Sequence, residues 1–144
     1  MARNKSGCER RLREPLIPEP EKSYRTLMKA NTGLRHIALK TRDLKKTERF
    51  YTEVLGLKVA FRVSRNMIFL SSARGNDLLN FIKSDEKARS DQGLDHFGFK
   101  ISKAHLKEIE QRLKRDGVEI EGRRGRSSIY FRDPNGYMVE CYCD

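Results

Sequence analysis

The sequence predicts an α+β fold in which two βαβββ modules in tandem form one cupped mixed sheet with the helices on its outer face. Three observations predict it. The 144 residues provide material for one domain with one sizeable core. A strand–helix–three-strand order of apolar segments occurs twice. A shift of 60 residues between the two occurrences places His36 on His96.

The first module occupies residues 33–85. Leu34–Thr41 alternates as a strand does, and Lys45–Leu55 has the apolar period of an amphipathic helix, which Gly56 ends. Three short apolar runs follow, and each predicts a strand: Leu57–Val63, Asn66–Ser71 and Asp77–Lys83.

The second module occupies residues 93–144 and repeats this order. Leu94–Ser102 predicts a strand, and Ala104–Arg115 predicts a helix that Gly117 ends. The same shift of 60 residues that aligns the histidines also places Asn80 on Glu140. Agreement at several positions indicates an internal repeat. The three remaining predicted strands are Val118–Glu121, Ser128–Phe131 and Met138–Cys143.

Residues 1–30 form a separate basic segment, which holds three of the four prolines and no sustained apolar period. Prolines make such a segment stiff and extended, so we expect an arm that lies across its own domain or a partner subunit. A disordered basic tail is the alternative. The apolar residues available for docking are Leu16, Ile17, Tyr24, Leu27 and Met28.

Charge and composition argue against nucleic acid and membranes as binding partners. The net charge is +11, but the basic side chains of the second helix alternate with acidic ones, as on a solvated face. Arg123–Arg126 is a basic cluster without interleaved aromatic residues, which disfavours nucleic acid as a partner. No apolar stretch is long enough for a membrane helix. The N-terminus lacks a secretion signal, so we expect a cytoplasmic protein with free thiols at Cys8, Cys141 and Cys143.

Strand alternation brings three polar side chains to one face of the sheet. His36, His96 and Glu140 lie opposite the apolar faces that pack beneath the helices. Burying an unpaired carboxylate costs several kcal/mol, and a metal ion at Glu140 would remove that cost. Two imidazoles and one carboxylate bind a divalent metal and leave coordination positions open for a substrate or water. His105, among the lysines of the second helix, is expected at the surface.

Three segments carry a family resemblance: LRHIALKTRDLKKTERFYTEVLGLKV, LDHFGFKI and SIYFRDPNGYMVE. They resemble the vicinal oxygen chelate superfamily, which includes glyoxalase I, fosfomycin-resistance thiol transferases, extradiol dioxygenases and bleomycin-resistance proteins. The resemblance covers about three-quarters of the chain. It implies a cup around a divalent metal, usually in a homodimer. The metal positions correspond to His36, His96 and Glu140, and the fourth position to Asn80.

The resemblance also implies roles for residues beside the metal. Tyr130, ten residues before Glu140, matches a tyrosine that assists catalysis in extradiol dioxygenases. The histidine that those enzymes carry just before this tyrosine is missing, which argues against dioxygenase chemistry. From the resemblance, Glu140 and Tyr130 are the expected catalytic residues. Asn80, Lys100 and Tyr130 are the expected substrate contacts.

Together these features predict a metal-dependent enzyme whose small substrate chelates the ion through vicinal oxygens. The ion could be Fe, Mn, Zn or Ni, since this ligand set accepts each of them. Lyase or isomerase chemistry, oxygen insertion and group transfer all remain open. The alternatives are a non-catalytic small-molecule binding protein of the bleomycin-resistance kind and, less favoured, a nucleic-acid-binding regulator.

Overall fold

The computed structural model describes residues 33–86 and 93–144. The expectation of an arm or tail at residues 1–30 lies outside the described residues. None of the described helices has the length and apolar character needed to cross a membrane.

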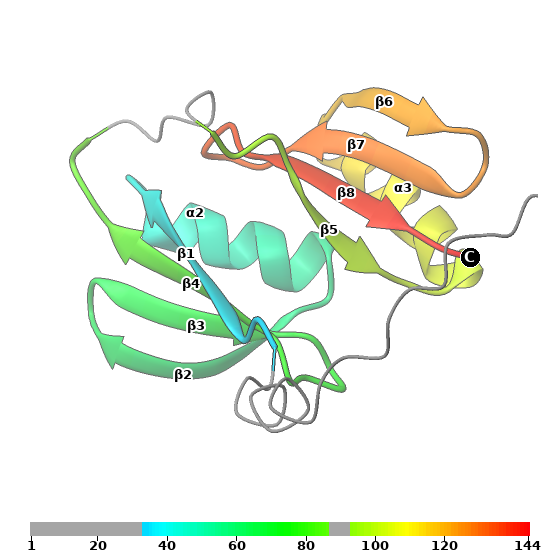
Figure 1. The fold of residues 1–144 in the computed structure, drawn as a ribbon. Coiled ribbons are helices and arrows are strands. Elements are labelled where there is room, and N and C mark those ends of the chain that lie inside the picture. Colours follow the sequence, from blue (N-terminus) through cyan, green and yellow to red (C-terminus); the bar gives the residue numbers. More distant parts are fainter. Residues whose placement is uncertain (1–32, 87–92) are drawn as a thin grey trace, which may run out of the picture. The chain divides into compact units, whose positions relative to one another are not determined.

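The first module forms a four-stranded sheet in the order β1-β4-β3-β2 (Figure 1). Strand β4 pairs in parallel with β1 and antiparallel with β3, which makes the sheet mixed. The elements are β1 (His36–Thr41), α2 (Leu44–Arg49), η1 (Phe50–Val54), β2 (Lys58–Ser64), β3 (Met67–Ser71) and β4 (Leu78–Lys83).

The second module repeats this topology, with the sheet order β5-β8-β7-β6. Its last strand again lies between its first strand, in parallel, and its third strand, antiparallel. The predicted pair of βαβββ modules is thereby confirmed. The elements are β5 (Phe97–Lys100), α3 (Lys103–Arg115), β6 (Ile120–Arg124), β7 (Ser128–Arg132) and β8 (Met138–Tyr142).

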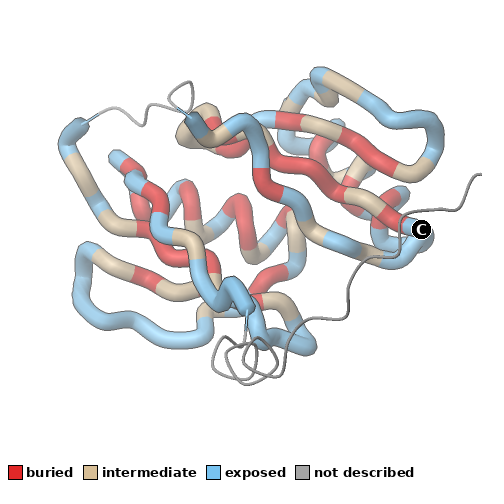
Figure 2. Tube along the Cα trace, viewed as in Figure 1, coloured by how far each residue is buried: buried red, intermediate tan, exposed pale blue. Residues whose placement is uncertain are grey.

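The two faces of each sheet differ in burial, as the sequence alternation predicts. Residues Ile68 and Leu70 of β3 are fully buried, whereas Phe69 between them is half-buried. In the second sheet Val139 and Cys141 are likewise fully buried on the core face. Glu140, between them on the opposite face, is buried as well, so buried residues follow each other along β8 (Figure 2). The buried faces of both modules contribute to one hydrophobic core. The opposite faces are left for polar side chains.

The first helix departs from the regular period that the sequence predicts. Its α-helical part ends at Arg49, and a π-helical turn covers Phe50–Val54. Phe50 and Tyr51 in this turn are both buried, and their rings lie 5.5 Å apart, nearly perpendicular. The regular α-helical period therefore ends at Arg49.

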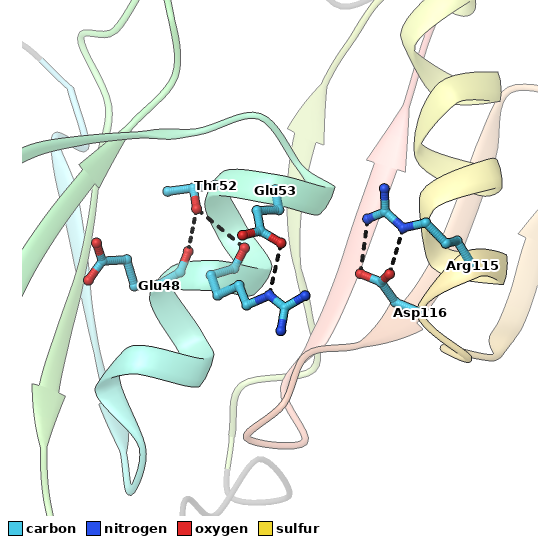
Figure 3. A network of polar contacts seen from close by, with 6 residues as sticks. Glu48, Thr52, Glu53, Arg115 and Asp116 are labelled. Carbon is cyan, nitrogen blue, oxygen red and sulfur yellow. Dashed lines mark hydrogen bonds and ion pairs between the residues drawn. The ribbon is translucent and has the colours of Figure 1, made fainter.

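Short polar contacts stabilise the ends of the two helices. Figure 3 shows Thr52, which donates to the carbonyl of Arg49 at 3.3 Å. It also shows two ion pairs: Nε of Arg49 lies 2.9 Å from Oε2 of Glu53, and Nε of Arg115 lies 2.7 Å from Oδ1 of Asp116. Ion pairs exposed to solvent contribute little free energy. The stability of the fold therefore depends on the core and on buried polar contacts.

A buried polar contact joins the two modules at the turn between β7 and β8. The hydroxyl of Tyr51 donates to Oδ2 of Asp133 at 2.9 Å, and both side chains are buried. The backbone N–H groups of Asn135 and Tyr137 donate to the other oxygen, Oδ1. Burial raises the pKa of Asp133, and the hydrogen bonds from Asn135 and Tyr51 oppose that rise. The ionised form of the Asp133 carboxylate is therefore stabilised by these hydrogen-bond donors.

The same turn holds the end of β1. The hydroxyl of Thr41 donates to Oδ1 of Asn135 at 2.7 Å. The phenol oxygen of Tyr137 accepts from the backbone N–H of Lys40 and donates to its carbonyl, both at 3.2 Å. Because β1 is an edge strand, these groups have no partner strand on that side. The turn thus satisfies buried polar groups of both modules.

Removal of the Tyr51 hydroxyl should destabilise the protein. In the Tyr51→Phe variant, Oδ2 of Asp133 loses a donor inside the core, and we expect the free energy of unfolding to fall by about 1–3 kcal/mol. Urea denaturation measures this difference. The matched control is Tyr142→Phe, because the Tyr142 hydroxyl has no hydrogen-bond partner among the described residues. An equal change in both variants would contradict a specific role of the Tyr51–Asp133 contact.

Candidate metal centre

The candidate site is built on the centre of the second sheet. Glu140 lies on β8, flanked by Gly98 on β5 and by Tyr130 on β7. Gly122 on β6 is the next register partner, beside Tyr130. All four residues are on the face away from the core. The Glu140 side chain is only 10% exposed, so its charge must be compensated locally.

The two oxygens of Glu140 have different surroundings. Oε1 accepts hydrogen bonds from the Ser128 hydroxyl at 2.6 Å and from the Tyr130 hydroxyl at 2.7 Å, with an Arg124 nitrogen at 3.4 Å. Oε2 faces Nε2 of His96 at 3.5 Å. Burial by itself would raise the pKa of Glu140, but the hydrogen bonds from Ser128 and Tyr130 outweigh it and lower this pKa. Glu140 is therefore an ionised carboxylate with one oxygen held and the other directed at an imidazole.

The neighbour of His96 determines which of its nitrogens carries a proton. Nδ1 lies 2.6 Å from Oδ2 of Asp95. A carboxylate only accepts hydrogen bonds, so Nδ1 is the donor, and in the neutral ring Nε2 presents its lone pair. A carboxylate behind the ring is the usual orienting partner of a metal-binding histidine. The ring is also fixed edge-on to Tyr130, at a centroid distance of 5.6 Å.

His96 and Glu140 fit two positions of a divalent metal site. A tetrahedral ion with bonds of about 2.1 Å to each donor would hold the two donor atoms about 3.4 Å apart, close to the observed 3.5 Å. The remaining carboxylate oxygen is fixed by Ser128 and Tyr130, as ligating carboxylates commonly are. Among the described residues, however, no three His, Cys, Asp or Glu side chains gather around one point. The second histidine of the predicted set does not join this pair.

His36 and Asn80 lie on the first sheet. His36 is exposed on β1, and its ring contacts the edge of Phe69 at a centroid distance of 6.5 Å. Asn80 is 2% exposed, and its amide donates to the carbonyl of Ile68 at 2.9 Å. The structure therefore leaves His36 accessible to a ligand, whereas the Asn80 amide already has a protein partner.

Of the two remaining predicted residues, Tyr130 and Lys100, only Tyr130 has a contact with Glu140. Tyr130 contacts it directly, whereas Lys100 is an exposed side chain whose Nζ lies 2.5 Å from Oδ2 of Asp144. That hydrogen bond and charge raise the pKa of Lys100. Ser128 was not predicted as a site residue, although strand alternation places it on the same face as Tyr130. No pattern in the sequence indicated that Arg124 or Asp95 would lie beside Glu140 or His96.

An open hollow of about 820 Å³ lies beside the His96–Glu140 pair. Its size suits a small organic molecule. Its lining includes His96, Tyr130, Gly122, Arg132 and Met138, which combine polar and apolar surface.

Comparison with known proteins identifies a superfamily and several related proteins. The family model described as the Glyoxalase/Bleomycin resistance protein/Dioxygenase superfamily matches residues 33–141. The fosfomycin resistance protein FosX of Listeria monocytogenes is 28% identical over 77% of this chain and 89% of its own. The glutathione transferase FosA of Serratia marcescens is 27% identical over 76% of this chain and 79% of its own.

A solved structure of a variant of that Listeria FosX holds Mn(II) and a dihydroxypropylphosphonic acid. It superposes on this chain with a TM-score of 0.65 at 25% identity, over 78% of this chain and 92% of the other. The similarity therefore extends across both modules and the sheet faces that carry the candidate residues.

The two glycines beside Glu140 and Tyr130 provide a test of the site. A Cβ on Gly98 would lie 3.3 Å from Oε2 of Glu140 and 3.3 Å from the Tyr142 ring, whereas one on Gly122 would make ordinary contact at 3.5 Å. We expect Gly98→Ala to weaken Mn(II) binding because it displaces the oxygen that faces His96. Gly122→Ala should leave the affinity within about two-fold. Calorimetric titration with Mn(II) compares them, and equal affinities would exclude Oε2 as a ligand.

Proposed function

Because the chain belongs to the glyoxalase/bleomycin resistance protein/dioxygenase superfamily, we propose that it is a metal-dependent enzyme whose small substrate chelates the ion through adjacent oxygens. The observation that carries this proposal is the asymmetric environment of Glu140. Three donors surround one carboxylate oxygen, and the other points at an imidazole nitrogen. A carboxylate with a purely structural role would not need one oxygen directed at an imidazole, which is itself a common metal ligand.

The proposed ligands of the ion are His36, His96 and Glu140. Fe, Mn, Zn and Ni are all compatible with two imidazoles and a carboxylate, and Mn(II) is the ion in the related FosX structure. When bound, a divalent ion polarises the oxygens of the substrate. Ser128 and Asp95 orient the two ligands of the second sheet. Isomerase or lyase chemistry, oxygen insertion and group transfer are each compatible with this arrangement.

We further propose that His36 reaches the site from a second copy of the chain. His36 is exposed on the first sheet. On the second sheet His96 and Glu140 provide only two of the three proposed ligands among the described residues. Since the two sheets have the same strand order, a twofold dimer can place the first sheet of one subunit opposite the second sheet of its partner. Each homodimer would then contain two equivalent sites.

Tyr130 is the proposed catalytic side chain beside the ion. Its ring lines the open hollow, and its hydroxyl donates to Glu140 at 2.7 Å. The same hydroxyl can exchange that bond for one to a substrate oxygen and move a proton there. Lys100 and Asn80 are the further proposed substrate contacts.

We also propose that the protein is cytoplasmic.

Substitution of the carboxylate should abolish tight metal binding. In Glu140→Gln the neutral amide cannot offset the charge of the ion, and we expect the Mn(II) affinity to fall by about ten- to a hundred-fold or more. The control is His105→Ala, because His105 is exposed on α3, where its ring contacts Ser102. Calorimetry and thermal melting should show unchanged metal binding and folding for the control. Unaltered affinity in Glu140→Gln would exclude Glu140 as a ligand.

Mixing two defective subunits tests where His36 comes from. His36→Ala and Glu140→Gln should each lack tight Mn(II) binding alone. After the two variants are mixed and allowed to exchange subunits, a shared site predicts one intact and one doubly defective site in each mixed dimer. Random exchange then gives about one tight site per four chains. Absence of any recovered site, with exchange verified by native mass spectrometry, would contradict a site shared between subunits.

A further inference from the structure

Two aromatic rings form an unusual exposed surface on the first sheet. Phe61 of β2 and Phe69 of β3 are register partners, and their rings stack at a centroid distance of 4.5 Å with 21° between their planes. Phe61 is 47% exposed and is one of three large apolar side chains exposed among the described residues. We call these two rings the aromatic wall. Phe69 is half-buried beneath the Phe61 ring. Clustered apolar side chains that remain open to water are candidates for a ligand contact.

The aromatic wall adjoins a proposed metal ligand. The ring of Phe69 contacts the ring of His36 at 6.5 Å, with an interplanar angle of 62°. In the second sheet His96 meets Tyr130 in the corresponding way, at 5.6 Å and 84°. The internal repeat therefore places one aromatic ring beside each proposed histidine ligand. A molecule that chelates an ion held by His36 must lie next to the wall.

The two sheets differ in the chemistry of this corresponding surface. Tyr130 uses its hydroxyl to donate to Glu140, and its register partner on the edge strand is Gly122, which adds no side chain. Phe69 has no hydroxyl, and its register partner on the edge strand is a second phenylalanine, Phe61. One side of the bound molecule would therefore meet hydroxyl and charged groups, and the other side would meet stacked rings.

We propose that the aromatic wall is a specificity site that receives a planar apolar group of the substrate, attached to the oxygens that chelate the ion. This inference rests on the proposed function, because it places the substrate at the metal. Because Phe61 and Phe69 stack on each other, one face of each ring is covered, and the substrate group would pack against the ring surface that stays open. Packing against aromatic rings favours an aromatic or conjugated group over a small aliphatic one. Phe61 supplies the outer part of the wall, and Phe69 supplies the part next to His36.

The test compares two probes with the same chelating group. Acetohydroxamic acid and benzohydroxamic acid both bind metals through two adjacent oxygens, but only the second carries a phenyl ring. Calorimetry on the Mn(II)-loaded protein gives the ratio of their affinities. Phe61→Ala should reduce the preference for benzohydroxamic acid by about 3- to 10-fold relative to the unaltered protein. The control Val63→Ala removes exposed apolar surface from the same strand and leaves both rings in place, so its ratio should not change.

Each alternative result overturns the proposal in a recognisable way. An unchanged affinity ratio in Phe61→Ala would show that the wall does not contact the ring, while the metal-dependent function would stand. Equal losses for both probes, together with weaker self-association on sizing, would assign the wall to a contact between subunits. Failure of the unaltered protein to bind Mn(II) would overturn the proposed function and this inference with it.

Discussion

The buried negative charge of Glu140 governs the arrangement of polar groups on the open face of the second sheet. Glu140 occupies the central strand, where an uncompensated carboxylate would cost several kcal/mol. Ser128 and Tyr130, two residues apart on the adjacent strand, supply hydroxyls to the same oxygen. Gly98 on the other side leaves the space that the second oxygen occupies. The neighbours of Glu140 on both strands are thus set by the need to keep it ionised.

The two modules share a backbone plan but have diverged in what their open faces can do. In the first sheet the position corresponding to Glu140 is Asn80, which turns its amide to the carbonyl of Ile68. A neutral side chain there needs no surrounding hydroxyls, and phenylalanine replaces tyrosine at the neighbouring position. The open face of the second sheet therefore carries polar groups around Glu140, whereas the corresponding face of the first sheet carries apolar rings around Asn80.

Much of the fold is predictable because strand alternation and glycine-terminated helices are local signals. The repeat between His36 and His96 predicts identical topology for both modules, and the sheet orders agree with it. The π-helical turn over Phe50–Val54 was not predicted, because an apolar helical period indicates a helix without distinguishing an α-helical from a π-helical turn. Sequence parity places His36, His96 and Glu140 on corresponding faces, but it does not encode whether two sheets of one chain or of two chains face each other.

The order of strands also constrains how the chain acquires its structure. In each sheet the first strand pairs with the last. The register partner of His36 is therefore Leu78 and that of Phe97 is Val139, each far along the chain. Such distant pairing adds an entropic cost to the closure of each sheet and slows it. The first module can complete its sheet as soon as β4 emerges from the ribosome. The turn that carries Asp133 follows much later in the chain, so the Tyr51 hydroxyl gains its buried acceptor only with the second module, whereas the Thr41 hydroxyl already has Thr47 of the first module as a partner.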